Sequence, residues 1–219
     1  MDFVNVHTHQ AAVEPNVLGI VNQYPQSLDV TVPFFSVGIH PWYIEPARIE
    51  ADLRIISDTV ALEHCLALGE CGLDKRTAVP LELQVSVFEQ QLALAEKYQK
   101  PMIIHCVAAF QELIELKIKN KSTVPMVVHG FSKNEQVAAQ LLKNGFYLSF
   151  GKYLLQNPEL ERVFCTIPND RFFLETDTVA ETIQEVYAVA AQYKKIELKE
   201  LQKIIAYNFN TVFKDGRMD

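Results

Sequence analysis

Two histidines close the first apolar run of the chain, and their spacing suits a shared metal ion. His7 and His9 end the run that begins at Phe3, with one residue between them. In an extended chain, side chains two positions apart point to the same face, so both imidazoles can reach one point past the strand's end. Imidazole is the commonest metal ligand in proteins. A lone His-x-His is more often a pair of surface or turn histidines than a metal site, so the rest of the chain must decide.

Further side chains with metal-binding chemistry close other apolar runs in the same way. They are His40, Glu70, His105, His129 and Asp177. Together with the first two histidines they stand at the ends of six different runs, which points to a site assembled where strands end. Imidazole nitrogens and carboxylate oxygens are suitable ligands for divalent ions such as Zn, Mn or Mg.

Eight strand-like runs, most of them followed by a helical pattern, predict a parallel sheet. The runs cover residues 3–9, 17–21, 34–39, 65–69, 101–104, 124–128, 146–150 and 172–174. Helical spacing is expected at 46–56, after Pro80, after Phe110, and at 180–192 and 196–213. Two capping-box patterns, Ser132 with Glu135 and Thr178 with Glu181, predict helix starts.

The polar residues at the strand ends decide between two parallel architectures. An open doubly wound sheet would hold groups on opposite edges far apart, whereas a (β/α)8 TIM barrel brings all strand ends to one cavity. The sequence therefore predicts an α/β fold of the (β/α)8 class in a single domain over residues 1–219. The connections after the first two runs are too short for full helices, so a slightly compressed barrel is expected.

Composition limits the partners and the compartment. A net charge of −7 argues against an extended nucleic-acid-binding surface, although a small molecule or a short nucleic acid could still be the substrate. The four cysteines have no CxxC spacing, which indicates reduced thiols in a cytoplasmic protein. We expect no signal peptide, no membrane span and a monomer.

Six motifs in order carry a resemblance to a known family. They are His7-Thr8-His9, Val37-Gly38-Ile39-His40-Pro41, Gly69-Glu70-Cys71-Gly72-Leu73-Asp74, Pro101-Met102-Ile103-Ile104-His105, Val128-His129-Gly130-Phe131 and Glu175-Thr176-Asp177. This set resembles the TatD family of metal-dependent hydrolases, within the amidohydrolase-like barrels. The resemblance covers essentially the whole chain and includes Gln84 and Gln91.

The resemblance implies a centre of two divalent metal ions, Mg, Mn or Zn. One ion would be held by His7, His9, Glu70 and Asp177, and the other by Glu70, His105 and His129. Glu70 would bridge the ions, and Asp177 would also orient or deprotonate the attacking water, so both count as catalytic. His40 and Asp74 are the expected substrate-binding residues.

One departure from the family pattern bears on the substrate. The family typically has an arginine two residues after the histidine at position 105, and this chain has Val107. Candidate replacements for that cation are Lys75, Arg76, Lys133 and Lys152. Cleavage of phosphodiester bonds in DNA or nucleotides is the leading prediction. The alternatives are an amidohydrolase or esterase acting on a substrate other than nucleic acid, and a metal-binding barrel without turnover.

Overall fold

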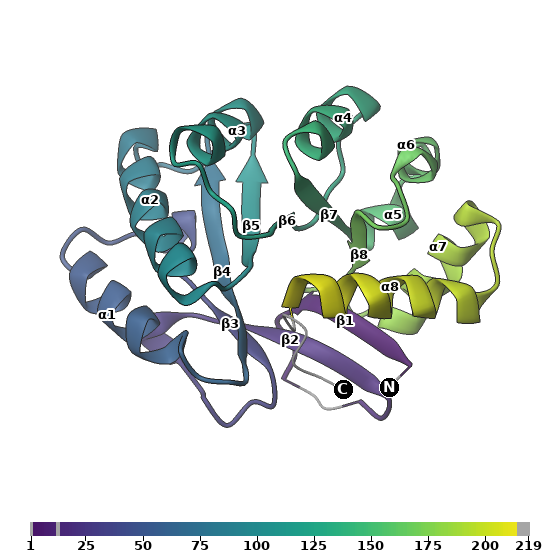
Figure 1. The fold of residues 1–219 in the computed structure, drawn as a ribbon, viewed down its shortest axis with the longest axis horizontal. Helices are drawn as coiled ribbons and strands as arrows, with labels where there is room; N and C mark the ends of the chain where they lie inside the picture. Colours follow the sequence, from purple (N-terminus) through teal and green to yellow (C-terminus); the bar gives the residue numbers. More distant parts are fainter. Residues whose placement is uncertain (1, 12–13, 214–219) are drawn as a thin grey trace. The chain divides into compact units, whose positions relative to one another are not determined.

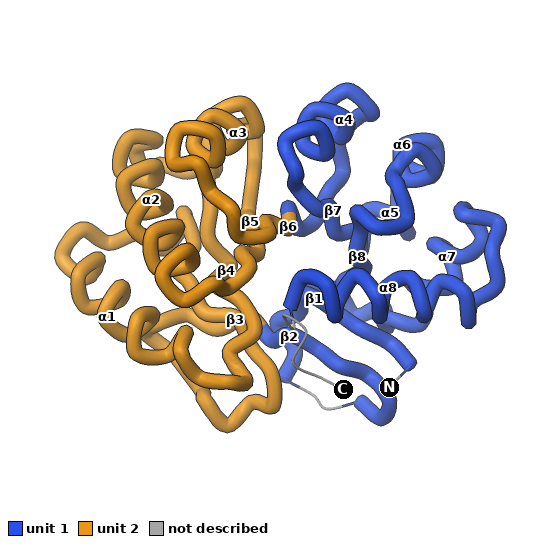
Figure 2. The backbone as a smooth tube through the Cα atoms, viewed as in Figure 1, with its two compact units in different colours: residues 1–21, 128–219 blue, residues 22–127 orange. Residues whose placement is uncertain are grey.

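The computed structural model describes residues 2–11 and 14–213. The chain divides into two compact units, which Figure 2 shows in different colours. Unit 1 comprises residues 1–21 and 128–219, and unit 2 comprises residues 22–127. Residues from both ends of the sequence therefore build unit 1.

All eight predicted strands are present, and hydrogen-bonded neighbours follow the order of the sequence. The strands are β1 (Phe3–Thr8), β2 (Val17–Gln23), β3 (Phe35–Val37), β4 (Cys65–Asp74), β5 (Met102–Val107), β6 (Met126–Val128), β7 (Phe146–Phe150) and β8 (Phe172–Leu174). The pairs β1–β2, β3–β4, β4–β5 and β7–β8 are parallel. Strands in this order, alternating with helices, define the (β/α)8 class, so the predicted fold class is confirmed.

Helices follow most of the strands (Figure 1). They are α1 (Ile49–Thr59), α2 (Leu81–Tyr98), α3 (Phe110–Lys119), α4 (Glu135–Lys143), α5 (Lys152–Gln156), α6 (Leu160–Thr166), α7 (Ile183–Lys194) and α8 (Leu198–Phe213), with 3-10 turns η1 (Pro25–Ser27) and η2 (Pro41–Tyr43). In the described residues between β1 and β3 the only helical element is the turn η1, so the predicted short connections are confirmed. No helix within 2–11 and 14–213 is both long and apolar enough to cross a bilayer.

The core of unit 2 forms where α2 packs on β4. Spacing along 81–95 predicted an apolar helix face, and Phe88, Leu92 and Ala95 are indeed buried. The strand β4 is buried along its whole length and extends to Asp74. It is therefore longer than the predicted run of 65–69, and Glu70 lies inside the strand rather than beyond its end.

The core of unit 1 lies beneath α7 and α8, which both contact β1 and β8 (Figure 1). Tyr187 of α7 is fully buried and its hydroxyl donates to the carbonyl of Val4 and accepts from the amide of the same residue, each at 3.1 Å. Phe209 of α8 is also buried. These contacts fix the strand that carries the two N-terminal histidines.

Both predicted capping boxes were wrong. The N-cap of α4 is Asn134, whose side chain accepts from the amide of Val137. The capping box of α7 pairs Thr182 with Glu185 instead of the pair four residues earlier. Thr182 has the extended backbone conformation that an N-cap requires, and the helix begins at the next residue. The position of the capping box therefore follows from the backbone conformation. Helix α1 begins at Ile49, three residues later than predicted from Pro46.

Glu96 of α2 holds the loop that leads into β6. Its carboxylate accepts from the hydroxyl of Ser122 at 2.6 Å and from the amides of Thr123 and Val124 at 2.7 and 3.2 Å. Burial raises the pKa of this carboxyl, but the hydrogen bonds lower it more, so the net pKa lies below the usual glutamate value. The charged form is thus favoured by folding.

We expect Glu96→Gln to lower the free energy of unfolding by about 1–2 kcal/mol at neutral pH. Because the folded pKa is depressed, this stabilisation is present above the unfolded pKa of glutamate and is lost as the pH falls through the folded pKa. Urea unfolding of both proteins from neutral pH into the acid range should show the difference shrinking. Glu63→Gln, at an exposed position of the same unit, is the control and should change little. A difference in the free energy of unfolding between wild type and Glu96→Gln that stays constant with pH would contradict the prediction.

Candidate metal centre

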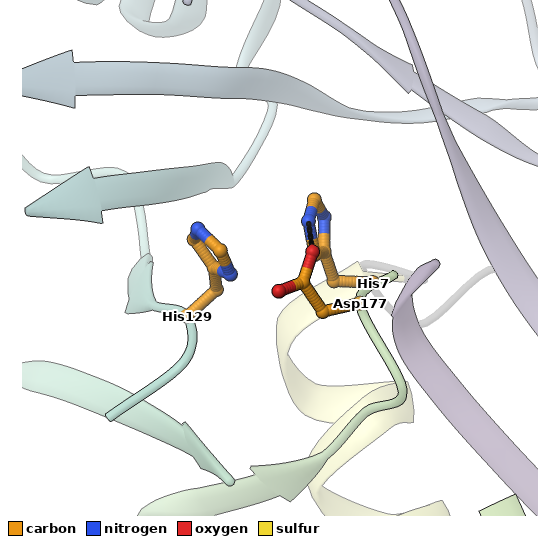
Figure 3. Close-up of side chains that lie close together, drawn as sticks. All are labelled: His7, His129 and Asp177. Carbon is orange, nitrogen blue, oxygen red and sulfur yellow. Dashed lines mark ion pairs between the residues drawn. The ribbon is translucent and has the colours of Figure 1, made fainter. Parts of the chain in front are cut away.

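The first cluster of ligand atoms lies in unit 1. His7, His129 and Asp177 each offer a ligand atom, and these atoms all lie within 4.8 Å of one another (Figure 3). Asp177 Oδ1 is 3.7 Å from His7 Nε2 and 3.5 Å from His9 Nε2. The structure thus brings together the four candidate ligands that belong to this unit.

Backbone pairing between the ends of β1 and β8 positions these side chains. The amide of Asp177 donates to the carbonyl of His7, and the amide of His9 donates to the carbonyl of Asp177, both at 3.0 Å. Asp177 has a φ of 56°, a left-handed conformation that aspartate tolerates better than most residues. The turn at this residue therefore aims its carboxylate back at the two histidines.

A buried polar network secures the same junction. The Asn5 side chain donates to Thr176 Oγ1 at 2.9 Å and accepts from the Thr176 amide at 3.1 Å. Thr176 Oγ1 in turn lies 3.1 Å from Thr8 Oγ1. Sequence analysis missed Asn5 and Thr8 as positioning residues. A polar residue inside an apolar strand is the one signal that could have marked Asn5.

Lys152, the first residue of α5, completes the surroundings of Asp177. Its Nζ donates to Asp177 Oδ2 at 3.0 Å, so one carboxylate oxygen faces the ammonium and the other faces the histidines. Burial raises the pKa of the Asp177 carboxyl, but the nearby imidazole of His7 and the hydrogen bond from the Lys152 ammonium outweigh it and hold the pKa well below its usual value. Asp177 is therefore ionised and able to accept a cation at neutral pH.

Glu175 stands behind His129 and is fully buried. Its Oε1 accepts from the amide of Gly130 at 2.8 Å and lies 3.4 Å from His129 Nδ1. A carboxylate at Nδ1 favours the tautomer with its proton on that nitrogen, which leaves Nε2 as an acceptor for a metal. The carboxylate thus orients the imidazole and selects its ligand atom.

The second cluster lies in unit 2, where residues of the neighbouring strands β4 and β5 meet the residue that precedes the turn η2. His40, Glu70 and His105 offer ligand atoms that all lie within 4.8 Å of one another. Glu70 Oε1 is 3.1 Å from His40 Nε2 and 3.0 Å from His105 Nδ1. Asn22 fixes the strand here by accepting from the Glu70 amide at 2.7 Å.

Two glutamines on α2 hold the loops around this cluster. Gln84 accepts from the Asp74 amide at 2.7 Å and donates to the Asp74 carbonyl at 3.0 Å. Gln91 makes the same pair of contacts with Ile39, at 2.8 and 3.2 Å. Each glutamine side chain therefore makes the pair of backbone hydrogen bonds that an adjacent strand would otherwise make. In this way the two glutamines position the segments that carry Asp74 and His40.

His40 has the geometry of a hydrogen-bond donor rather than a metal ligand. Its Nδ1 accepts from the amide of Trp42 at 3.0 Å. In the neutral ring the proton then lies on Nε2, which points at Glu70. A protonated ring nitrogen does not bind a metal, so this geometry favours the predicted role of His40 in substrate binding.

His105 lies between two carboxylates. Its Nε2 is 3.1 Å from Asp74 Oδ2, while its Nδ1 faces Glu70 Oε1. With the proton on Nε2 and directed at Asp74, the Nδ1 lone pair and the Glu70 oxygen would point at a common cation. Asp74 thus supports the imidazole of His105, in addition to the substrate contact that was predicted for it.

The donor sets of both clusters fit divalent metals. Unit 1 gathers two imidazoles and a carboxylate, from His7, His129 and Asp177, and unit 2 gathers the imidazole of His105 and the carboxylate of Glu70. These are the ligand types that zinc and manganese use in hydrolases. Buried carboxylates behind His105 and His129 supply the outer hydrogen bonds that such ligands require. The first set consists of residues of unit 1, and the second set consists of residues of unit 2.

Comparison with known proteins agrees with this chemistry. The family described as TatD-related DNase matches residues 2–214. The uncharacterized metal-dependent hydrolase YabD of Bacillus subtilis is 31% identical over 199 residues, which are 83% of this chain and 77% of that protein. The 3'-5' ssDNA/RNA exonuclease TatD of a Rahnella species is 33% identical over 149 residues, 65% of this chain and 56% of that protein.

A solved structure shows the same fold. The TatD homologue YjjV from Escherichia coli superposes with a TM-score of 0.83 over 97% of this chain and 98% of that one, at 20% identity. The match to the family over nearly the whole chain, together with the YabD relative, therefore shows that this chain belongs to the TatD family of metal-dependent hydrolases.

Proposed function

We propose that this chain hydrolyses phosphodiester bonds of DNA or nucleotides. The observation that carries the proposal is the cluster of His7, His129 and Asp177, with a cation, Lys152, beside it. Support comes from a relative that is named as an exonuclease on single-stranded DNA and RNA. The proposal includes two divalent metal ions, Mg, Mn or Zn, with Glu70 as a ligand of both.

Asp177 has the central role in unit 1. Its ionised carboxylate would hold a cation through Oδ1 and would accept a hydrogen bond from the attacking water, which would thereby be oriented. Lys152 holds Oδ2 and so prevents the carboxylate from rotating. The ammonium also places a positive charge where a phosphate oxygen can be stabilised.

In unit 2, Glu70 and His105 would bind a cation through Oε1 and Nδ1. His40 would donate its Nε2 proton either to Glu70 or to a phosphate oxygen of the substrate. Asp74 would act through His105 by fixing the tautomer of that ring. Divalent ions bound at such donors supply Lewis-acid stabilisation of phosphoryl oxygens and make water a nucleophile at neutral pH.

Removal of the metal is expected to abolish turnover. Protein stripped with a chelator should hydrolyse bis(p-nitrophenyl) phosphate and a short single-stranded DNA at least about 10²-fold more slowly than protein reloaded with Mg²⁺, Mn²⁺ or Zn²⁺. Thermal unfolding should show a higher midpoint after reloading, because a ligand of the native state stabilises it. Rates with each ion, measured beside the ion content, identify the ion that supports catalysis.

Three outcomes separate this function from its alternatives. Cleavage restored by metal establishes a phosphodiesterase. Metal binding without cleavage of either substrate would favour an amidohydrolase or esterase, or a barrel without turnover, and a panel of amide and carboxylic ester substrates would then distinguish these two. Protein that binds no divalent ion would contradict the metal centre itself.

We also propose that residues 1–219 act as one hydrolase domain, as predicted from the sequence. A reducing compartment such as the cytoplasm is proposed because the cysteines have no CxxC spacing and three of the four are buried in the core. Burial raises the pKa of the Cys71 thiol, next to Glu70, well above its usual value, so this thiol stays protonated. Cys71 is therefore a core residue in this proposal and contributes no thiolate to the metal centre.

A further inference from the structure

A small pocket in unit 2 adjoins the second cluster. It has a volume of about 280 Å³ and is lined by Trp42, Asp74, Arg76, Thr77 and Val107. Asp74 links the pocket to the second cluster, because it lines the pocket and its carboxylate also contacts His105. Whatever occupies the pocket therefore lies directly beside a proposed ligand of the metal centre.

Trp42 is held rigidly at the edge of this pocket. Its indole Nε1 donates to the buried carboxylate of Asp74 at 2.6 Å. The ring packs edge-on against His40 and His105, with centroids 4.9 and 5.5 Å apart and interplanar angles of 78° and 75°. In spite of these contacts the residue is 54% exposed.

An aromatic ring fixed in this way is suited to stacking. Ordering a flexible side chain costs entropy when a ligand binds, whereas Trp42 is already ordered by its hydrogen bond and its two ring contacts. Single exposed aromatic residues are ordinary on protein surfaces. Trp42 differs because it lines a cavity and is anchored to the buried Asp74, so its open surface faces a space that a flat ligand can enter.

The other walls of the pocket match the remaining parts of a nucleotide. The amide of Arg76 donates to Asp74 Oδ1 at 2.8 Å, and Arg76 is an exposed residue that lines the pocket. A guanidinium pairs with phosphate through two parallel hydrogen bonds. Thr77 contributes a hydroxyl that can bond to a base or sugar, and Val107 contributes an apolar wall.

We propose that this pocket binds one nucleobase of the substrate, stacked on Trp42, with the adjoining phosphate held by Arg76. The proposal deepens the proposed function and rests on it in one respect, that the substrate is a nucleic acid or nucleotide. Stacking depends little on which base is present, because every base has a π face. The pocket therefore favours substrates that carry a base over simple phosphodiesters, with little preference among bases.

The sole tryptophan of the chain makes the proposal directly measurable. Tryptophan fluorescence of this chain therefore reports on Trp42 alone. Titration with dAMP should quench this fluorescence to saturation, whereas deoxyribose phosphate, which lacks the base, should leave it nearly unchanged. Arg76→Gln should weaken the apparent affinity for dAMP about tenfold, with less effect on deoxyadenosine, which lacks the phosphate. No quenching by dAMP, or equal quenching by deoxyribose phosphate, would overturn the proposal.

Kinetics provide a second, independent readout. The wild-type protein should prefer an oligonucleotide with its terminal base over the same strand with an abasic end by about tenfold or more in kcat/KM. Trp42→Ala should remove most of that preference, and Trp42→Phe should retain part of it. Tyr207→Ala removes an aromatic residue of α8 that is more exposed than Trp42, at 67% against 54%, and should keep the full preference. A preference that survives Trp42→Ala would contradict the stacking role.

The two proposals fail in different ways. Quenching by dAMP without cleavage of DNA would support the base-binding pocket and count against the nuclease. Cleavage of DNA without quenching would support the nuclease and overturn the pocket. The fluorescence measurement uses the unmodified protein, so neither result depends on whether a variant folds.

Discussion

Asp177→Asn is expected to lower metal-dependent hydrolysis of a phosphodiester about 10²- to 10⁴-fold. The reason lies in the two oxygens of the carboxylate, of which Oδ1 faces His7 and His9 while Oδ2 accepts from Lys152. An asparagine can present only one acceptor. Either its amide nitrogen meets the ammonium of Lys152, or it replaces the oxygen that faces the histidines.

Three measurements check this expectation. Steady-state kinetics on bis(p-nitrophenyl) phosphate give the loss in turnover, titration with Mn²⁺ gives the loss in metal affinity, and thermal unfolding of the metal-free proteins tests the fold. Asp170→Asn makes the same chemical change at an exposed site of unit 1 and should match the wild type in all three. An Asp177→Asn protein with wild-type turnover would exclude this carboxylate from the reaction.

The sequence predicted the fold, and it marked the proposed ligands, because both leave local patterns. Apolar runs of strand length alternate with helical spacing, and each proposed ligand closes or follows such a run. In the structure, His7, Glu70 and His105 lie inside the strands that these runs form. The extension of β4 to Asp74 could not be read from hydrophobicity, because the polar residues after Gly69 resemble a loop. Their burial depends on the pairing of β4 with β5.

The residues that sequence analysis missed act across long distances in the chain. Asn5 and Thr176 hydrogen-bond although 171 positions separate them, and the strand register that unites them is not visible in either segment. The predicted capping boxes were wrong for a local reason, because a short sequence pattern does not by itself identify the N-cap. Before α7 the pattern occurs twice, at Thr178 and at Thr182, and before α4 it occurs at Ser132, two residues ahead of the true cap Asn134. Only the backbone conformation selects Thr182 and Asn134 as the caps.

The close approach of β4 to β5 in unit 2 depends on Gly72. This residue pairs with His105 across the two strands, and its φ of 147° is one that side chains of other residues rarely allow. A Cβ added here would lie 1.9 Å from the carbonyl oxygen of His105. Because that atom belongs to the backbone, no side-chain rotation can relieve the clash.

We therefore expect Gly72→Ala to lower the free energy of unfolding by about 3 kcal/mol or more, which corresponds to a fall of roughly 6–12 °C in the unfolding midpoint. Gly19→Ala is the matched control, because a Cβ at this strand glycine meets only Thr8 Cγ2 at 3.6 Å, an ordinary contact. If the variant folds, the strands must move apart locally. The 3.0 Å approach of Glu70 to His105 should then lengthen, and metal affinity should fall together with stability. A Gly72→Ala protein as stable as the Gly19→Ala control would show that β4 and β5 do not need this contact to hold Glu70 beside His105.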